Sequence, residues 1–283
     1  METILCPTDF SPVSENAVRY ADELAQRMNS RIVLFHNIHE PVGAGDFSAG
    51  GMPYVEPLRD AGLRKAQEEK LEALKTSLQQ TDWGMPIAYQ TRISYGLIRD
   101  TLPGLARQVQ ADLVVMGHES PAGLEKIFRG STAAEAIKSL PCPVLVVPAG
   151  ITFKPIHKIV FATDLEGEPF TDVALVSKLA GLFDAELLFV HVLTDQARET
   201  RERALAGLER LHKRLNYKNA SFYTETNPHV AEGIGQFTRL HQADMLVMGF
   251  HPRNLLLQLF TSIQVQEAAY HAFLPLLVIH YHQ

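Results

Sequence analysis

The chain is poor in cysteine and has no long run of basic or of apolar residues. Its two cysteines, Cys6 and Cys142, cannot form a disulfide framework, so we expect buried free thiols in a reducing compartment. The formal net charge is −6 and no Lys/Arg cluster of useful length occurs, so no nucleic-acid partner is expected. No apolar stretch is long enough for a membrane span, and no charged leader precedes one. These absences predict a cytoplasmic protein without a membrane partner.

Several catalytic and nucleotide-binding motifs are also missing. The chain has no Walker lysine loop, no Gly-x-Gly-x-x-Gly fingerprint after its first strand and no Gly-x-Ser-x-Gly nucleophile elbow. It also lacks the His-x-Gly-His and Ser-Gly-Gly-x-Asp-Ser turns of adenylyl-transfer enzymes. No general base is evident beyond Glu119, so the only enzymatic role we consider is slow ATP cleavage. No catalytic residue is assigned.

What the chain does contain is a repeated segment. Residues 111–117 read ADLVVMG and residues 243–249 read ADMLVMG, with five of the seven letters identical. An apolar run of this kind is typical of a central parallel strand that is buried on both faces, and the final glycine predicts a tight turn. One domain has therefore been built twice, and we expect domains over residues 1–150 and 151–283, each with a core of its own.

Strands and helices are predicted to alternate in both halves. Ser11 is a good N-cap and Pro12 suits the first position of the helix that follows the first strand. The alternation implies an α/β fold of two doubly wound, Rossmann-like, five-stranded parallel sheets. The expected strands are residues 4–7, 32–38, 86–94, 111–117 and 143–147, then 159–162, 186–192, 221–226, 245–248 and 276–279. The expected helices include residues 12–28, 63–78, 98–109, 132–140 and 198–215.

The two copies differ in length. Asp9 and Asp164 are 155 positions apart, whereas Gly117 and Gly249 are 132 apart, so the second copy is 23 residues shorter between these points. Residues 41–57, rich in glycine and proline, account for much of the difference. They follow the second strand at the edge of the sheet where ligands bind in open α/β folds. Two interpretations stay open, namely a loop over a binding site and an idle insertion.

Three short segments of the first half are expected to meet at this edge. They are Thr8-Asp9 after the first strand, the turn Gly117-His118-Glu119-Ser120 after the fourth, and Gly130-Ser131-Thr132 at the start of the last helix. A helix start with small residues presents free backbone N–H groups that suit a phosphate, and glycine lets the backbone approach a ligand. An aspartate accepts hydrogen bonds from a ribose.

The residues at these positions resemble the universal stress proteins in their tandem two-domain form. ILCPTDFS (residues 4–11) looks like the family's opening strand and loop, and residues 114–148 look like its nucleotide-binding end. The family pattern is Gly, two residues, Gly, nine residues, Gly and Ser or Thr. Here Ser120 replaces the middle glycine. If that position needs a positive φ, the serine costs about 1 kcal/mol and weakens binding, whereas at an ordinary φ its hydroxyl adds a phosphate contact.

The resemblance implies a site for ATP or AMP, with Mg²⁺ accompanying ATP. It also implies that the fifth strands of the two domains pair across a pseudo-twofold axis and that the tandem chain forms a homodimer. In ATP-binding members the acidic residue of the first loop lies by the ribose, and the backbone after the second strand meets the adenine. The glycine-rich turn and the Gly-Ser helix start hold the phosphates. Carried over, the nucleotide-binding residues are Thr8, Asp9, Asn37, Met116, Gly117, Ser120, Gly130, Ser131 and Thr132.

The second half departs from this pattern. Asp164 and Gly249 remain, but Pro252, Ser262 and Ile263 stand where the first half has Ser120, Gly130 and Ser131. We therefore expect no triphosphate site there. The apolar residues 255–257 and 259–260 either pack against a partner subunit or are buried in their own domain. His251 follows Gly249 at the same edge, where solvated or core histidines are favoured over a metal site, and no metal ligand is assigned.

Three functions are compatible with the sequence. The leading hypothesis is a stress-response protein that binds an adenine nucleotide in its first domain and acts as a nucleotide-dependent regulator. The second is a binding or scaffold protein with both sites degenerate, and the third is a slow ATP hydrolase.

Overall fold

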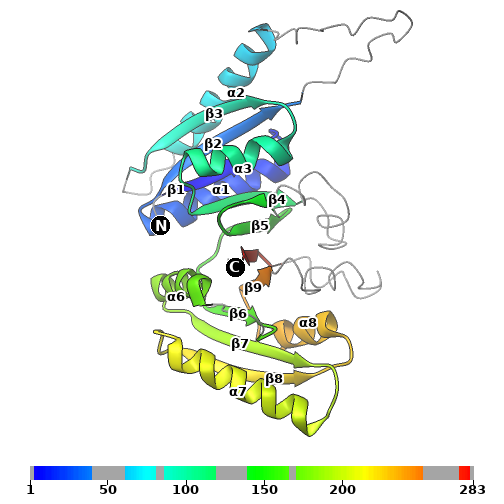
Figure 1. The fold of residues 1–283 in the computed structure, drawn as a ribbon. Coiled ribbons are helices and arrows are strands. Elements are labelled where there is room, and N and C mark those ends of the chain that lie inside the picture. Colours follow the sequence, from blue (N-terminus) through cyan, green and yellow to red (C-terminus); the bar gives the residue numbers. More distant parts are fainter. Residues whose placement is uncertain are drawn as a thin grey trace, which may run out of the picture.

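A single ten-stranded sheet runs through both halves of the protein (Figure 1). The computed structural model describes residues 3–39, 61–80, 86–118, 139–165, 170–250 and 274–280. The strand order is β3-β2-β1-β4-β5-β10-β9-β6-β7-β8, so the second half repeats the order of the first as a mirror series. All neighbours are parallel except β5 and β10, which pair antiparallel. The predicted fold is confirmed, including the pairing of the two fifth strands.

Each half contributes five strands with helices between them. The first half consists of β1 (Thr3–Pro7), α1 (Pro12–Met28), β2 (Arg31–Ile38), α2 (Ala61–Gln79), β3 (Tyr89–Tyr95), α3 (Ile98–Gln108), β4 (Leu113–His118) and β5 (Val144–Pro148). The second consists of β6 (Lys158–Ala162), α6 (Phe170–Phe183), β7 (Glu186–Leu193), α7 (Arg198–Arg214), β8 (Ala220–Thr226), α8 (Val230–Leu240), β9 (Met245–Phe250) and β10 (Leu276–His280).

The N-terminus of α1 is fixed by local hydrogen bonding. The Ser11 Oγ accepts a hydrogen bond from the Ser14 N–H at 3.2 Å, and Pro12 occupies the first turn, where its missing N–H costs nothing. The predicted cap is thus confirmed. Along α1 the buried residues recur at helical spacing and face the sheet. They include Ala17, Val18, Ala21, Leu24 and Ala25.

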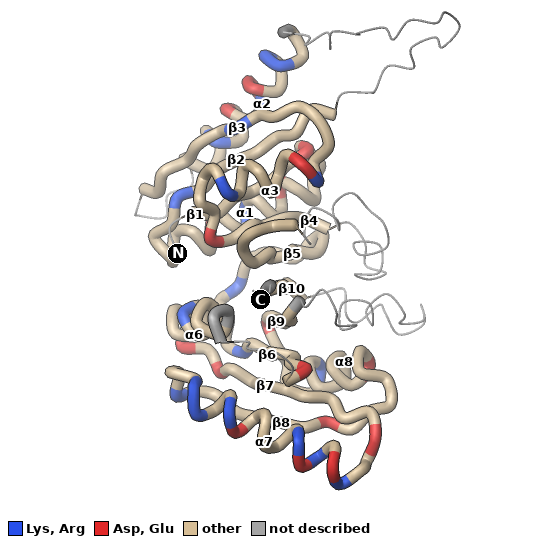
Figure 2. The backbone as a smooth tube through the Cα atoms, viewed as in Figure 1, with Lys and Arg blue, Asp and Glu red and all other residues tan. Residues whose placement is uncertain are grey.

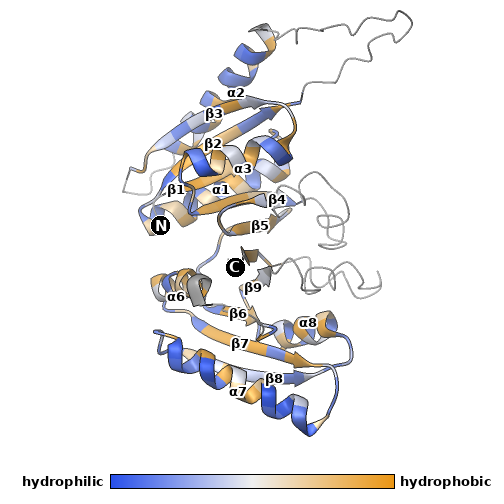
Figure 3. Cartoon of the chain, viewed as in Figure 1, coloured by the Kyte–Doolittle hydropathy of each residue, from blue (hydrophilic) through white to orange (hydrophobic). Residues whose placement is uncertain are grey.

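Helices cover both faces of the sheet, and the central strands are mostly apolar (Figure 3). One core lies under α1, α2, α6 and α7, and the other lies under α3 and α8. Both cores contain strand residues from the two halves, so the sheet is one continuous packing unit. Cys6 and Cys142 are free and buried, one in each core, as predicted. Burial raises the pKa of the Cys142 thiol to about 12 and that of Cys6 further.

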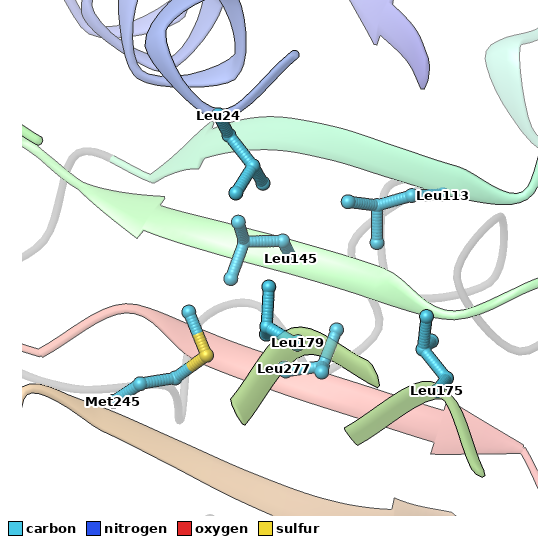
Figure 4. Close-up of a pocket in the computed structure, with 7 residues that line it drawn as sticks. All are labelled: Leu24, Leu113, Leu145, Leu175, Leu179, Met245 and Leu277. Atoms are coloured by element: carbon cyan, nitrogen blue, oxygen red, sulfur yellow. The ribbon is translucent and has the colours of Figure 1, made fainter. Parts of the chain in front are cut away.

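The junction between the halves is apolar and well filled. Next to the β5–β10 pair a cavity of about 10 Å³ remains among leucine and methionine side chains (Figure 4). A space of that size holds at most one water molecule, and an apolar lining gives water no partner, so this is a packing gap rather than a ligand site. The cavity is lined by Leu24, Leu113, Leu145, Leu175, Leu179, Met245 and Leu277.

The segment that joins the halves packs against α1. The Asn16 Nδ2 donates to the Ile151 carbonyl at 2.9 Å, and the Phe153 ring lies 5.0 Å from that of Tyr20. The guanidinium of Arg27 lies 4.4 Å above the same Phe153 ring. These contacts hold the first half against the connection to the second.

The outer face of α7 carries charges of both signs (Figure 2). Arg198 pairs with Glu202, and Arg203 pairs with Glu199, one helical turn apart in each case. Exposed pairs of this kind contribute a few tenths of a kcal/mol each, roughly 0.3–0.5. They support the helix and leave a solvated surface of mixed charge.

The repeated Ala-Asp sequence has a structural purpose in both halves. The Asp112 Oδ2 accepts the Thr3 N–H at 3.0 Å, where β1 begins next to β4. The Asp244 Oδ2 accepts the N–H groups of His157 and Lys158 at 2.7 and 2.9 Å, where β6 begins next to β9. The aspartates therefore satisfy the first donors of the neighbouring strand at the end of the sheet opposite the expected site.

Among the predicted boundaries that differ from the structure, the end of the fourth strand matters most for the site. The fourth strand was expected to end in a turn at Gly117, but β4 continues through Gly117 and His118, which pair with Val147 and Pro148 of β5. β5 extends to Pro148, one residue further than predicted. Its pairing with β4 therefore continues to His118 and keeps the end of β4 extended. The predicted helix 132–140, apart from its last two residues, and the loop 41–57 lie outside the described residues.

Candidate functional site

The described site residues lie at the carboxyl ends of three adjacent strands, β2, β1 and β4. Thr8 and Asp9 follow β1, Asn37 lies near the end of β2, and Met116 and Gly117 lie near the end of β4. The chain runs outward from β1 to β2 and β3 and then returns to β4 on the other side of β1. In open α/β sheets, ligands bind at the carboxyl edge where the strand order reverses in this way.

Thr8 is occupied by contacts within its own loop. Its side chain is buried, and its Oγ1 accepts the Phe10 N–H at 3.0 Å and lies 2.9 Å from the Ser14 Oγ. Its N–H donates to the Phe35 carbonyl at 2.8 Å. These bonds use the hydroxyl to shape the loop and to join it to α1.

Asp9, by contrast, is exposed at the end of β1. Its Oδ1 accepts the Ser11 N–H at 3.0 Å. Partial burial opposes ionisation, but hydrogen bonds from Ser11 and Ser14 outweigh it, so the pKa of the Asp9 carboxyl lies below its usual value. The loop therefore presents an ionised acceptor to solvent at neutral pH.

The backbone of this loop is held in a conformation that few residues adopt. Phe10 has a φ of 64°. Its ring lies 4.6 Å from that of His36, and the Lys70 Nζ lies 5.6 Å above it. The His36 Nδ1 is 2.8 Å from the Thr8 carbonyl, and because a carbonyl only accepts, Nδ1 carries the hydrogen. His36 thus holds the loop in place through the Thr8 carbonyl.

The side chain of Asn37 joins the ends of β2, β3 and α3. Its Nδ2 donates to the Gly96 carbonyl at 2.6 Å, and its Oδ1 accepts from the Thr101 Oγ1 at 2.8 Å. The Gly96 N–H in turn donates to the Ile38 carbonyl at 3.1 Å. Gly96 has a φ of 118°, which only glycine adopts without strain.

Gly117 is a glycine for a structural reason. A Cβ at this position would lie 2.5 Å from the Val13 carbonyl oxygen and 2.9 Å from the Val13 Cγ1. The first turn of α1 thus occupies the space that a side chain would need. We expected this glycine to let the backbone approach a ligand, but in the structure it lets β4 approach α1. Met116 next to it is half-buried.

The proposed phosphate-binding residues Ser120, Gly130, Ser131 and Thr132 lie outside the described residues, as does Glu119. No role was predicted for His36, which recurs as His191 in the second half. Thr101 was not predicted either, because it shares no motif with Asn37 and contacts it from 64 positions away.

The second half repeats the loop and changes its surroundings. The Leu165 N–H donates to the Thr163 Oγ1 at 3.1 Å, Leu165 has a φ of 60°, and the His191 Nδ1 lies 2.8 Å from the Thr163 carbonyl. Where the first half has Asn37 and Thr101, the second has Val192 and Gly233. Pro252, Ser262, Ile263 and His251 lie outside the described residues. In the described part of the chain, no group of three or more His, Cys, Asp or Glu residues could hold a metal ion.

Comparison with known protein families decides the assignment. The model of the Universal stress protein family matches twice, over residues 1–148 and 155–280. The chain belongs to the universal stress protein family. Its resemblance to the tandem form is therefore confirmed, since two copies of the family's domain follow one another in one chain.

Individual relatives each match about half of the protein. A universal stress protein of Methanocaldococcus jannaschii is 31% identical over 144 residues, which cover 51% of this chain and 80% of the relative. A universal stress protein A homologue of Coxiella burnetii is 30% identical over 146 residues, which cover 51% of this chain and 94% of the relative.

A solved structure shares the whole tandem fold. The crystal structure of a universal stress protein from Archaeoglobus fulgidus aligns with a TM-score of 0.64 at 15% identity, covering 98% of this chain and 96% of that one. At this identity the likeness establishes the fold alone. Within the described ranges, no helix combines the length and hydropathy that crossing a bilayer requires.

Proposed function

We propose that the first domain, residues 1–150, binds an adenine nucleotide, ATP or AMP, and that its occupancy regulates a partner in the cytoplasm. The observation that carries the proposal is the exposed, ionised Asp9 at the point where the strand order reverses. An acceptor-only group at that edge suits the hydroxyls of a ribose. Buried free thiols in both cores support a reducing compartment.

The described residues fit the sugar and the base better than they fit the phosphates. Asp9 is an exposed acceptor, the end of β2 offers backbone groups beyond β1, and Met116 offers a half-buried apolar surface. In this proposal the phosphates bind at Gly130-Ser131-Thr132 with Ser120, where the sequence predicts a helix start whose N–H groups would suit an anion. Mg²⁺ would arrive with ATP and neutralise its phosphates.

The residues around the two equivalent loops support an asymmetric protein. In the second half, residues 151–283, the polar pair Asn37–Thr101 is replaced by Val192 and Gly233, which pack closely. The glycine and serine of the proposed phosphate site are replaced in sequence by Ser262 and Ile263. We propose that one nucleotide binds per chain and that the second domain serves assembly. Because β5 and β10 already pair within the chain, a homodimer of tandem chains would use another surface.

One observation favours a second candidate, a scaffold protein that binds no nucleotide. Thr8 and Gly117, two of the residues that the family resemblance assigns to the nucleotide, have structural roles that account for them without a ligand. The two candidates differ in whether the native protein contains a bound nucleotide.

Nucleotide content distinguishes them directly. Mass spectrometry of gently purified, then denatured protein should detect ATP or AMP in the nucleotide case. Added ATP with Mg²⁺ should raise the melting temperature, since a ligand that binds only the folded state stabilises it. Gly130→Val with Ser131→Val should remove that rise, whereas Ser262→Val, the matched change in the second half, should keep it. No nucleotide and no rise would establish the scaffold alternative. Phosphate released over hours and lost in Asp9→Ala would instead support slow hydrolysis.

A further inference from the structure

Among the described residues, only those of the first half tie the end of the second strand to the helix after the third strand through a polar cluster. Asn37 of β2 donates to the Gly96 carbonyl after β3 and accepts from the hydroxyl of Thr101 in the first turns of α3. The Thr101 Oγ1 also lies 3.2 Å from the Leu97 carbonyl, which anchors it to the start of its own helix. All three elements meet at the carboxyl edge of the sheet (Figure 1).

The second half fills the same place with apolar contacts. Val192 of β7 stands for Asn37, and Gly233 of α8 stands for Thr101. A Cβ at Gly233 would lie 2.9 Å from the Val192 Cγ1 and 3.0 Å from the Asn227 Cβ, so valine on the strand needs glycine on the helix. Asparagine occurs with threonine in one half and valine occurs with glycine in the other. The same fold therefore accepts either pair.

The position of Asn37 along β2 decides to which side its backbone N–H and C=O groups point. The Phe35 carbonyl accepts the Thr8 N–H, so the backbone groups of Phe35 face β1. Because backbone direction alternates along a strand, the N–H and C=O of Asn37 face the same side. The ladder between β1 and β2 ends at the pair Pro7 and Phe35, so it does not reach Asn37. The N–H and C=O of Asn37 therefore point past the end of this ladder, on the β1 side of β2.

We propose that Asn37 and Thr101 are positioning residues that hold this donor–acceptor pair in place for a 6-aminopurine base. This inference rests on the proposed function. The backbone C=O would accept from the 6-amino group and the N–H would donate to the adjacent ring nitrogen. A 6-oxopurine presents the reverse pattern, with an acceptor at position 6 and a donor at the ring nitrogen, so a rigidly held backbone rejects it. The side chains act by fixing the backbone, since both are already used in the cluster.

The test compares ATP with inosine triphosphate on the full chain. Dissociation constants are measured by titration calorimetry for the parent, Thr101→Val and Thr101→Ser. The valine keeps the shape but loses the hydroxyl, so the preference for ATP should fall by about five-fold, the worth of one hydrogen bond. The serine keeps the hydroxyl and should restore the parent ratio. Asn37→Val with Thr101→Gly installs the pair that folds in the second half, and it should lower the preference as Thr101→Val does.

The outcomes separate this inference from the function on which it rests. A parent that binds ATP and inosine triphosphate equally well overturns the inference and leaves nucleotide binding standing. The same holds if both Thr101→Val and the double variant keep the parent's ratio. A parent that binds neither nucleotide overturns the proposed function, and the inference falls with it. Val192→Asn with Gly233→Thr, the reciprocal exchange in the second half, should leave the ratio unchanged.

Discussion

The two halves of the protein share the loop after the first strand and differ in what surrounds it. Phe10 and Leu165 have φ values of 64° and 60°, and in each half a histidine Nδ1 lies 2.8 Å from the preceding threonine carbonyl. The second half has Ser262 and Ile263 in place of the glycine and serine of the proposed phosphate site, so we infer that this shared geometry does not depend on a nucleotide. The loop conformation and its histidine belong to the fold.

The differences lie on both sides of the loop. In the first half, Lys70 of α2 lies over Phe10, whereas in the second, Gly207 of α7 packs directly on Leu165, with the Leu165 Cδ1 only 3.0 Å from the site of a Cβ. On the opposite face, Asn37 and Thr101 give way to an apolar contact between Val192 and Gly233. The first half keeps polar groups around its loop, and the second replaces them with close packing. We infer that the shared features serve folding and that the polar groups of the first half serve its proposed function.

The largest expected effect concerns Gly117. Gly117→Ala places a methyl group 2.5 Å from the Val13 carbonyl, so we expect a loss of about 3 kcal/mol in the free energy of unfolding without any ligand. Gly104→Ala is the matched control, because no atom lies within 4 Å of its Cβ site, and it should stabilise α3 by roughly 0.5–1 kcal/mol. Denaturant unfolding measures both. Equal effects of the two changes would show that Gly117 is not required by α1.

A second test adds a methyl group to the close contact between Gly233 and Val192 in the second half. Gly233→Ala brings a Cβ to 2.9 Å from Val192, and we expect it to cost about 2 kcal/mol. In the Val192→Ala background the space is available, so the same change should cost less by roughly 1 kcal/mol. A double-mutant cycle by chemical unfolding gives this coupling. Strict additivity would contradict the close packing proposed for the second half.

The histidines should behave alike. His36→Ala and His191→Ala each remove one hydrogen bond to a threonine carbonyl, so each should lower the free energy of unfolding by about 1 kcal/mol. Thermal and chemical unfolding of the two variants check this. A loss in only one half would mean that the shared loop geometry has different origins in the two copies.

The smallest effect is the pH dependence that Asp9 contributes. Because the pKa of its carboxyl is lowered in the folded protein, its stabilisation is complete above the unfolded pKa of about 4 and is lost as the pH falls through the lower folded value. Asp9→Asn should therefore cost less than about 1 kcal/mol at neutral pH, as solvent screening limits an exposed group, and nothing in strong acid. NMR titration of the carboxyl should show its pKa rising in Ser11→Ala. An unchanged pKa in that variant would assign the shift to another cause.

Much of the fold could be predicted from the sequence because it depends on local pattern. The repeat at residues 111–117 and 243–249 indicated two copies, and the alternating apolar runs indicated parallel sheets. The cap at Ser11 followed from two adjacent letters, and it is confirmed. The end of the fourth strand was misplaced because Gly117 reads as a turn residue, whereas its pairing with Val147 keeps it in the strand.

The candidate site was less accessible to such reasoning. Asp9 and Asn37 could be chosen from their positions after strands, but the partners that orient Asn37 come from elements far away in sequence. The purpose of Gly117 depends on a helix turn about a hundred positions earlier. These are tertiary contacts between unlike segments, and no spacing rule within one segment encodes them.

The most direct test of the account is the number of adenine nucleotides bound per chain and where they bind. Titration calorimetry of the nucleotide-free full chain with ATP and Mg²⁺, or with AMP, should give one site. That site should be lost in Asp9→Ala and retained in Asp164→Ala, the matched change in the second half. Two sites, no site, or a single site that survives Asp9→Ala and disappears in Asp164→Ala would contradict it.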